Sequence, residues 1–229
     1  MEIKRLSLAK GAQEASGCAI VIDVFRGFSS EPLLYHCGAE KIFLESDIEK
    51  CLAMRHNAIL VGEKDGMPID GFHVTNSPYL ILQKGASFFS GHRVVHRTSA
   101  GVTGALTALH HANEVLLASF MTARATATYV LSQKCDIVSI IAMGNVAREK
   151  SPEDECCADY LEALLTEKPY DHLASIGNIL AHESAQKFLR GDKWYLPKED
   201  PAICLQKDLF PFTLRAEQRG DYVEAVRVY

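Results

Sequence analysis

Residues 18–24, with the sequence CAIVIDV, are the most informative stretch of the 229-residue chain. This run of apolar and β-branched residues is typical of a parallel strand that is buried on both faces. Helical patterns separate it from further apolar runs at residues 41–44, 58–61, 93–96, 114–118 and 136–142. The alternation of strands and helices predicts an α/β fold, a three-layer α/β/α arrangement with a mainly parallel or mixed sheet.

The ends of the elements give further expectations. Ser77 and Pro78 have the residue types of a helix cap and a first helical position. Residues 171–190 are predicted to form one amphipathic helix, and the alternating residues 222–229 a closing edge strand. Because no linker or low-complexity segment interrupts the chain, residues 1–229 are predicted to be one α/β domain, with two intertwined halves as the alternative.

Composition excludes several classes of function. The formal net charge is −5 and the arginines are isolated, which argues against a nucleic-acid partner. The seven cysteines contain no C-x-x-C pair, which favours reduced thiols in an intracellular protein. No apolar run reaches the length of a membrane span and the N-terminus lacks a signal-peptide pattern, so a cytoplasmic protein without membrane contact is expected.

The first polar cluster directly follows residues 18–22. In parallel α/β sheets, ligands bind beyond the carboxyl ends of the strands. Asp23 at such an end is suited to a hard cation, and Arg26 to a phosphate oxygen pair. Ser29 offers a hydroxyl and a backbone N–H group to an anion. A structural Asp–Arg pair with a capping serine is the equally weighted alternative.

Glu63 is a second carboxylate directly after an apolar run. Asn76 and Ser77 stand at a predicted helix N-terminus, where an anion is readily bound. Plain helix capping is the alternative for this pair.

A hydroxyl-rich turn follows the apolar run at residues 93–96. Arg97, Thr98, Ser99 and Gly101 combine a guanidinium, two hydroxyls and backbone N–H groups, which suit a phosphate group. The spacing is not that of a P-loop, and no G-x-G-x-x-G motif is present.

Glu153 and Asp154 lie in the first turn of a predicted helix after the last strong strand. Acids there commonly interact with the helix dipole. Either residue also faces the sheet edge of Asp23 and Glu63 if the fold is as predicted. Three carboxylates converging on Mg²⁺ would suit phosphoryl transfer.

These segments, in their order and spacing, resemble the 2-phosphosulfolactate phosphatase family. The resemblance covers residues 21–211. The residues that carry it are Val21 to Arg26, Gly62-Glu63, Gly71-Phe72, Asn76-Ser77-Pro78, Arg97 to Gly101, Ala118-Ser119-Phe120, Glu153-Asp154, Cys204-Leu205 and Asp208.

The resemblance implies a Mg²⁺-dependent phosphatase, a phosphoric monoester hydrolase, and a homodimer. The family's named reaction converts 2-phosphosulfolactate to sulfolactate and phosphate in coenzyme M biosynthesis. Two residues depart from the family's usual pattern. His73 replaces a common Asp, and Ala100 replaces a common Asn. If either missing group contacts substrate or metal, the substrate differs or the activity is weak.

The resulting hypothesis assigns Asp23, Glu63 and Asp154 to Mg²⁺. It assigns catalysis to Asp23, Arg26, Glu63, Arg97, Thr98 and Ser99, and binding of a small phosphorylated acid to Arg26, Ser29, Asn76, Ser77, Arg97 and Gly101. Water is the expected attacking group, because the chain lacks the D-x-D start of aspartyl-phosphate phosphatases. The alternative is a weak or inactive family member that binds a small anionic ligand.

Overall fold

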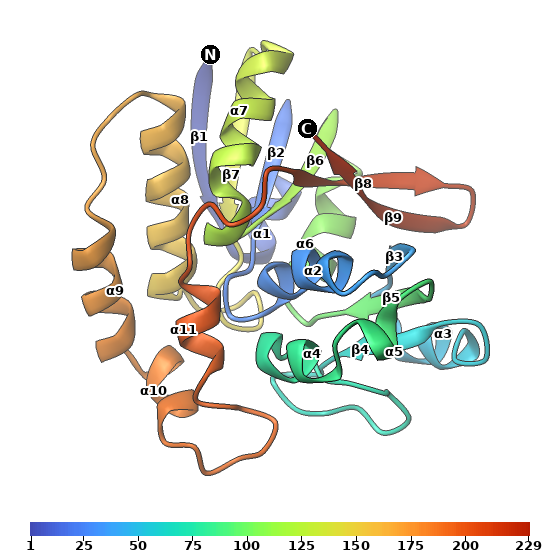
Figure 1. Ribbon diagram of the computed structural model, residues 1–229. Coiled ribbons are helices and arrows are strands. Elements are labelled where there is room, and N and C mark those ends of the chain that lie inside the picture. The colour runs from blue at the N-terminus through green and yellow to red at the C-terminus, as the bar shows by residue number, and fades with distance from the viewer.

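The computed structural model describes all 229 residues and contains a nine-stranded mixed sheet covered by helices on both faces (Figure 1). This confirms the predicted three-layer α/β fold. The strand order is β1-β7-β2-β6-β8-β9-β3-β5-β4. The strands are β1 (Glu2–Ser7), β2 (Cys18–Ile22), β3 (Lys41–Leu44), β4 (Ile59–Gly62), β5 (Arg93–Arg97), β6 (Glu114–Ala118), β7 (Ile137–Ala142), β8 (Thr213–Arg219) and β9 (Tyr222–Val228).

The helices fill most of the connections between strands. They are α1 (Leu8–Gln13), α2 (Gly27–His36), α3 (Ile48–Ala53), α4 (Pro78–Lys84), α5 (Ala86–Phe89), α6 (Gly101–Ala108), the 3₁₀ helix η1 (Phe120–Thr122), α7 (Ala123–Gln133), α8 (Pro152–Leu165), α9 (His172–Ala181), α10 (Glu183–Leu189) and α11 (Asp200–Cys204). No helix combines the length and the apolar character that a membrane span requires. The seven cysteines are all free thiols.

Strand β2 is buried on both faces because successive side chains enter different cores. Ile20 and Ile22 pack in the core that α7 and α8 cover, whereas Ala19 and Val21 pack in the core beneath α1, α2 and α6. All four side chains are fully buried. Burial of each Ile or Val contributes roughly 1.5–3 kcal/mol, so this strand anchors the residues that follow it.

Two groups of parallel strands form the sheet, and the β8–β9 hairpin joins them. Strands β1, β7, β2 and β6 are parallel to one another, as are β3, β5 and β4. The hairpin is antiparallel to its neighbours on both sides, so the two groups run in opposite directions along the sheet. Figure 1 shows the second group lying across the first. Although the two groups run in opposite directions, the segments that follow β2 and β5 are in contact, since Gly101 N–H donates to Asp23 at 2.9 Å.

The structure corrects two predicted elements. Strand β9 lies between β8 and β3, not at an edge of the sheet. Residues 171–190 form two helices, because His182 ends α9 and its ring caps α10 by accepting from Ser184 N–H at 3.1 Å. The predicted start of α4 is confirmed, since Ser77 Oγ accepts from Leu80 N–H at 3.2 Å and Pro78 is the first helical residue.

Candidate functional site

A narrow cavity of about 60 Å³ lies where the ends of β2, β4, β5 and β7 approach α8 and α10. A larger cavity of about 590 Å³ is lined by the loop between β4 and α4, by α4 and by Trp194, but no carboxylate lines it. The acids and cations that suit phosphate chemistry therefore gather at the narrow cavity. Its polar side chains are Asp23, Arg26, Glu63, Asn76, Ser99, Asn145, Glu153, Ser184 and Lys187.

Asp23 is held at the end of β2 by backbone donors on both carboxylate oxygens. Gly27 N–H donates to Oδ1 at 3.0 Å and Gly101 N–H to Oδ2 at 2.9 Å. A Cβ atom at Gly101 would lie 2.6 Å from Oδ2, so this close approach requires glycine. Burial raises the pKa of Asp23 to about 6, and the nearby Glu63 charge adds to the increase.

Glu63 bridges the end of β4 to the turn after β5. Ser99 N–H donates to Oε1 at 2.6 Å, and Gly66 N–H donates to Oε2 at 2.5 Å. Arg97 does not line the cavity. Its guanidinium donates to the carbonyls of Glu63 and Ser46 and to Ser99 Oγ, which holds the segment that carries Glu63. Arg97 is therefore placed to position Glu63.

Glu153 and Asp154 have different surroundings although they are adjacent. Asp154 accepts backbone N–H groups on both oxygens, from Val24 and from Gly144, each at 2.7 Å. Burial, followed by the charges of Glu153 and Asp23, raises the pKa of Asp154 well above its usual range. Asp154 thus ties two strand ends together behind the cavity. Glu153 lines the cavity, accepts from Ser184 Oγ at 2.7 Å through Oε2, and has no hydrogen bond on Oε1.

Arg26 is a buried member of an ion pair. Its Nη1 donates to Asp200 Oδ2 at 2.8 Å and to the Tyr195 carbonyl at 2.7 Å. Asp200 also accepts from Ser77 Oγ at 2.7 Å. Nε and Nη2 of Arg26 make no hydrogen bond within the protein, and the side chain lines the cavity. Arg26 therefore retains donors for a ligand although Asp200 balances its charge.

Of the remaining predicted residues, one lines the cavity and the others make hydrogen bonds outside it. Asn76 lines the cavity, and its buried Oδ1 has no hydrogen-bond donor. Ser29 donates to the Val24 carbonyl at 2.8 Å and does not reach the cavity. Thr98 accepts from Val102 N–H at 2.8 Å and lies 3.4 Å from Asp23 Oδ2. Ser77 serves as the α4 cap described above.

The structure thus places five of the predicted residues in the cavity wall and the others around it. The five are Asp23, Arg26, Glu63, Asn76 and Ser99; the others are Ser29, Ser77, Arg97, Thr98, Gly101 and Asp154. Sequence reasoning missed Ser184 and Lys187. Both lie on α10, and no motif marks them because the rest of the cavity wall is distant from them in sequence.

The two departures from the family pattern have different positions. Ala100 lines the narrow cavity, so a larger polar residue there would face a ligand. His73 lines the larger cavity, and its Nδ1 accepts from Leu60 N–H at 2.9 Å. Burial and the charge of Arg55 lower the pKa of His73.

The donor chemistry of the narrow cavity fits a hard cation. Its possible ligands are the carboxylates of Asp23, Glu63 and Glu153 and the unpartnered amide oxygen of Asn76. Oxygen donors of this kind suit Mg²⁺, which commonly binds one or two carboxylates and completes its shell with water and phosphate. The acids do not form a preassembled cluster of three metal-ligating side chains.

Comparison with known proteins identifies the family of this chain. The family model for 2-phosphosulpholactate phosphatase matches residues 5–218. The probable 2-phosphosulfolactate phosphatase of Caldicellulosiruptor saccharolyticus is 33% identical over 216 residues, covering 91% of this chain and 87% of the relative. The Bacillus subtilis protein of that name is 27% identical over 216 residues, covering 91% of both chains. This chain belongs to the 2-phosphosulpholactate phosphatase family.

Proposed function

We propose that this protein is a Mg²⁺-dependent phosphatase that hydrolyses a small 2-phospho acid, with 2-phosphosulfolactate as the first candidate. The products would then be sulfolactate and phosphate, as in the reaction that gives the family its name. The observation that carries the proposal is the cavity at the converging strand ends, lined by three carboxylates and by two cationic side chains.

In this proposal, Asp23, Glu63 and Glu153 hold the cation. Glu153 takes the role that the sequence hypothesis gave to Asp154, because Glu153 lines the cavity and has no hydrogen bond on Oε1, whereas Asp154 does not line the cavity. Bound Mg²⁺ would neutralise phosphate charge and lower the pKa of a bound water. Backbone donors fix the carboxylates of Asp23 and Glu63, so they need little reorganisation to bind a ligand.

The phosphate group is assigned to Arg26, Asn76 and Ser99. Arg26 has free donors at Nε and Nη2. The Ser99 hydroxyl accepts from Asp65 N–H and Arg97, and its only acceptor is Glu63 Oε2 at a long 3.4 Å, so a phosphate oxygen could replace that contact. The backbone N–H groups of Ser99 and Gly101 donate to Glu63 and Asp23, so they are not available to phosphate oxygens. Most of the phosphate binding is therefore assigned to side chains and not to the backbone N–H groups of the turn at residues 97–101.

Water remains the proposed attacking group. A covalent phosphoenzyme would require Asp23 to present a free oxygen in line with the phosphorus atom. Both of its oxygens accept backbone N–H groups, and Oδ2 also lies near the Thr98 hydroxyl. These contacts fix the carboxylate in one orientation, as a cation ligand requires, and the missing D-x-D start remains the reason for preferring water as the attacking group.

A panel of phosphoesters tests the assignment of substrate. Phosphate release would be measured from 2-phosphosulfolactate, 2-phospholactate, 2-phosphoglycerate and a simple alkyl phosphate at saturating Mg²⁺. We expect the highest kcat/KM for an ester that carries an acid group beside the phosphate. A preference for the simple alkyl phosphate would contradict a 2-phospho acid substrate.

One observation favours the alternative of a weak or inactive member that binds an anion. Ala100 lines the cavity at a position where the family often has Asn, so one polar contact to the ligand is absent. Stabilisation by sulfolactate or phosphate in a thermal unfolding assay, with no turnover of any ester, would support this alternative.

We also propose a cytoplasmic homodimer. The seven free thiols support a reducing compartment. The dimer rests on the resemblance to the family, and sedimentation of the purified protein would test it. A mass of one chain across the micromolar range would contradict it.

A further inference from the structure

Lys187 is a cation that the wall of the narrow cavity contains but that motif analysis did not find. It lies on α10, which lies beyond the carboxyl ends of β2 and β7 (Figure 1). Lys187 is half-buried and has no ion pair or hydrogen bond within the protein. Lys187 thus lines the same cavity as Asp23 and Glu63 but belongs to α10, whereas those two acids belong to the strand ends.

The other cations near the site are already engaged. Arg26 pairs with Asp200 at 2.8 Å, and Arg97 donates to two carbonyls and a hydroxyl outside the cavity. Lys187 is thus the cavity-lining cation whose charge no side chain pairs directly. Burying a charge without a partner is costly, and an anionic ligand would supply the missing partner.

Phe188 holds Lys187 and Arg26 in one arrangement. The Lys187 ammonium and the Arg26 guanidinium carbon each lie 5.2 Å from the centroid of its ring. Phe188 is almost fully buried, and it packs against Phe25 with ring centroids 5.6 Å apart. Cation–π contacts with one buried ring therefore hold the Lys187 ammonium and the Arg26 guanidinium beside each other in the cavity wall.

We propose that Lys187 binds the acid group that the substrate carries beside its phosphate, a sulfonate or a carboxylate. This inference rests on the proposed function. In that function the strand ends take the phosphate and its cation, so a second acid group on the same small molecule must lie farther out, toward α10. An ammonium group there would distinguish 2-phospho acids from simple phosphate esters.

Burial and the nearby Arg26 charge lower the pKa of Lys187, whereas the charges of Glu153, Glu63 and Asp23 oppose that decrease. Burial is the largest of these effects. An incoming sulfonate or carboxylate would favour the charged ammonium form in the same way as the acids do.

The test compares Lys187→Met with the wild type on esters that differ only in their acid groups. They are 2-phosphosulfolactate, 2-phospholactate with a carboxylate alone, the phosphate ester of 2-hydroxyethanesulfonate with a sulfonate alone, and isopropyl phosphate with neither. We expect KM to rise about 10- to 100-fold on each acid-bearing ester that uses Lys187, the loss of one charge-assisted hydrogen bond. On isopropyl phosphate we expect kcat/KM to stay within about twofold.

The two single-acid esters distinguish carboxylate from sulfonate as the partner. Lys187→Arg should restore much of the lost binding, and Lys198→Met, at an exposed position in the same C-terminal region, should have no effect. An equal loss on isopropyl phosphate would overturn the proposal in favour of phosphate binding or a structural role. An unchanged KM on every ester would overturn it as well.

Calorimetric binding of sulfolactate and of inorganic phosphate provides a readout that does not depend on turnover. Lys187→Met should weaken sulfolactate binding and leave phosphate binding unchanged. If the wild type releases no phosphate from any ester but the variant loses sulfolactate, the proposed function fails and the role of Lys187 stands. If the wild type is active and the variant binds sulfolactate normally, only the role of Lys187 fails.

Discussion

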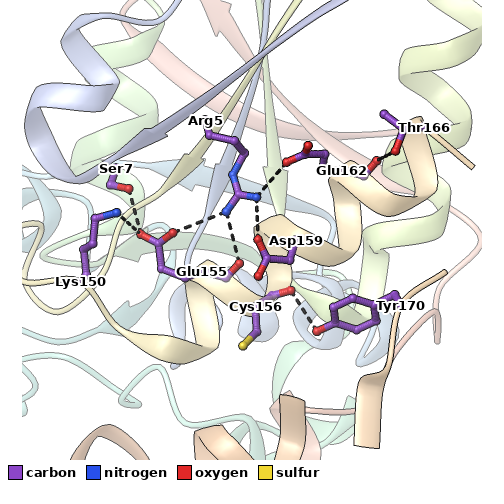
Figure 2. Close-up of polar contacts among 9 residues, drawn as sticks. All are labelled: Arg5, Ser7, Lys150, Glu155, Cys156, Asp159, Glu162, Thr166 and Tyr170. Carbon is purple, nitrogen blue, oxygen red and sulfur yellow. Dashed lines mark hydrogen bonds and ion pairs between the residues drawn. The ribbon is translucent and has the colours of Figure 1, made fainter. Parts of the chain in front are cut away.

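Helix α8 carries acids on two faces, and their surroundings differ sharply. Glu153 and Asp154 are buried beside the narrow cavity, at 4% and 2% exposure. Glu155, Asp159 and Glu162 lie on the face toward β1 and contact Arg5 there (Figure 2). Neighbours in sequence are separated by about 100° around a helix axis. Asp154 therefore lies on the buried face, whereas the next residue, Glu155, lies on the face toward β1.

The two groups of acids are stabilised by different partners. Arg5 donates to Asp159 at 2.7 Å and to Glu162 at 3.0 Å, and Ser7 donates to Glu155 at 2.9 Å. These side chains are partly exposed, so water screens the interactions. The acids at the cavity instead meet backbone N–H groups and one serine hydroxyl. The inner face of α8, with Glu153 and Asp154, therefore holds buried carboxylates at the cavity. The outer face, with Glu155, Asp159 and Glu162, attaches α8 to β1 through Arg5.

Replacing the cavity-lining acid should have the largest effect. Glu153→Gln keeps the shape and an acceptor for Ser184 Oγ but removes the charge proposed to hold the cation. We expect kcat to fall about 100-fold or more, with the midpoint of urea unfolding nearly unchanged. The matched control is Glu155→Gln on the outer face, which should retain close to full activity. A comparable fall in kcat in both variants would show that the two faces of α8 do not differ in function.

The second effect concerns stability. Asp154→Asn leaves one of the two N–H groups, from Val24 or Gly144, without an acceptor, because an amide presents one oxygen and one NH₂. We expect a loss of about 1–3 kcal/mol in the free energy of unfolding, measured by urea denaturation. Full stability in this variant would show that Asp154 does not tie the strand ends together.

The smallest effect is expected on the outer face. Arg5→Met removes the three ion pairs that Arg5 makes with acids of α8 (Figure 2), and the Arg5 side chain is 29% exposed in them. The free energy of unfolding should fall by about 1 kcal/mol at low salt and less at high salt. Denaturation curves at two ionic strengths would measure this. A loss larger than that of Asp154→Asn would reverse the ranking of the two faces.

The sequence predicted the part of the fold that depends on local pattern. The buried strand β2 and the acids that follow β2 and β4 were identifiable because apolar runs end abruptly in polar residues. The position of β9 was not, because alternation reports which faces are buried rather than the neighbours of a strand. Val223 and Ala225 of β9 are buried on one side, as in many interior strands of mixed sheets.

At the candidate site, the sequence could not predict the direction in which each side chain points. Glu153 and Asp154 were both candidates, and only the docking of α8 decides which of them lines the cavity. Lys187 was hidden because residues 171–190 have the pattern of one helix, while the break at His182 changes the direction that α10 faces. Contacts between residues far apart in sequence determine both features, and no local motif records them.

Initial rates of phosphate release from 2-phosphosulfolactate, with the wild type titrated first with EDTA and then with Mg²⁺, test the central claim most directly. The account predicts turnover that EDTA abolishes and that Mg²⁺ restores in a saturable way. Equal turnover in excess EDTA would contradict the proposal that Asp23, Glu63 and Glu153 hold a cation. No turnover at any Mg²⁺ concentration, from folded protein, would contradict a phosphatase acting on this substrate.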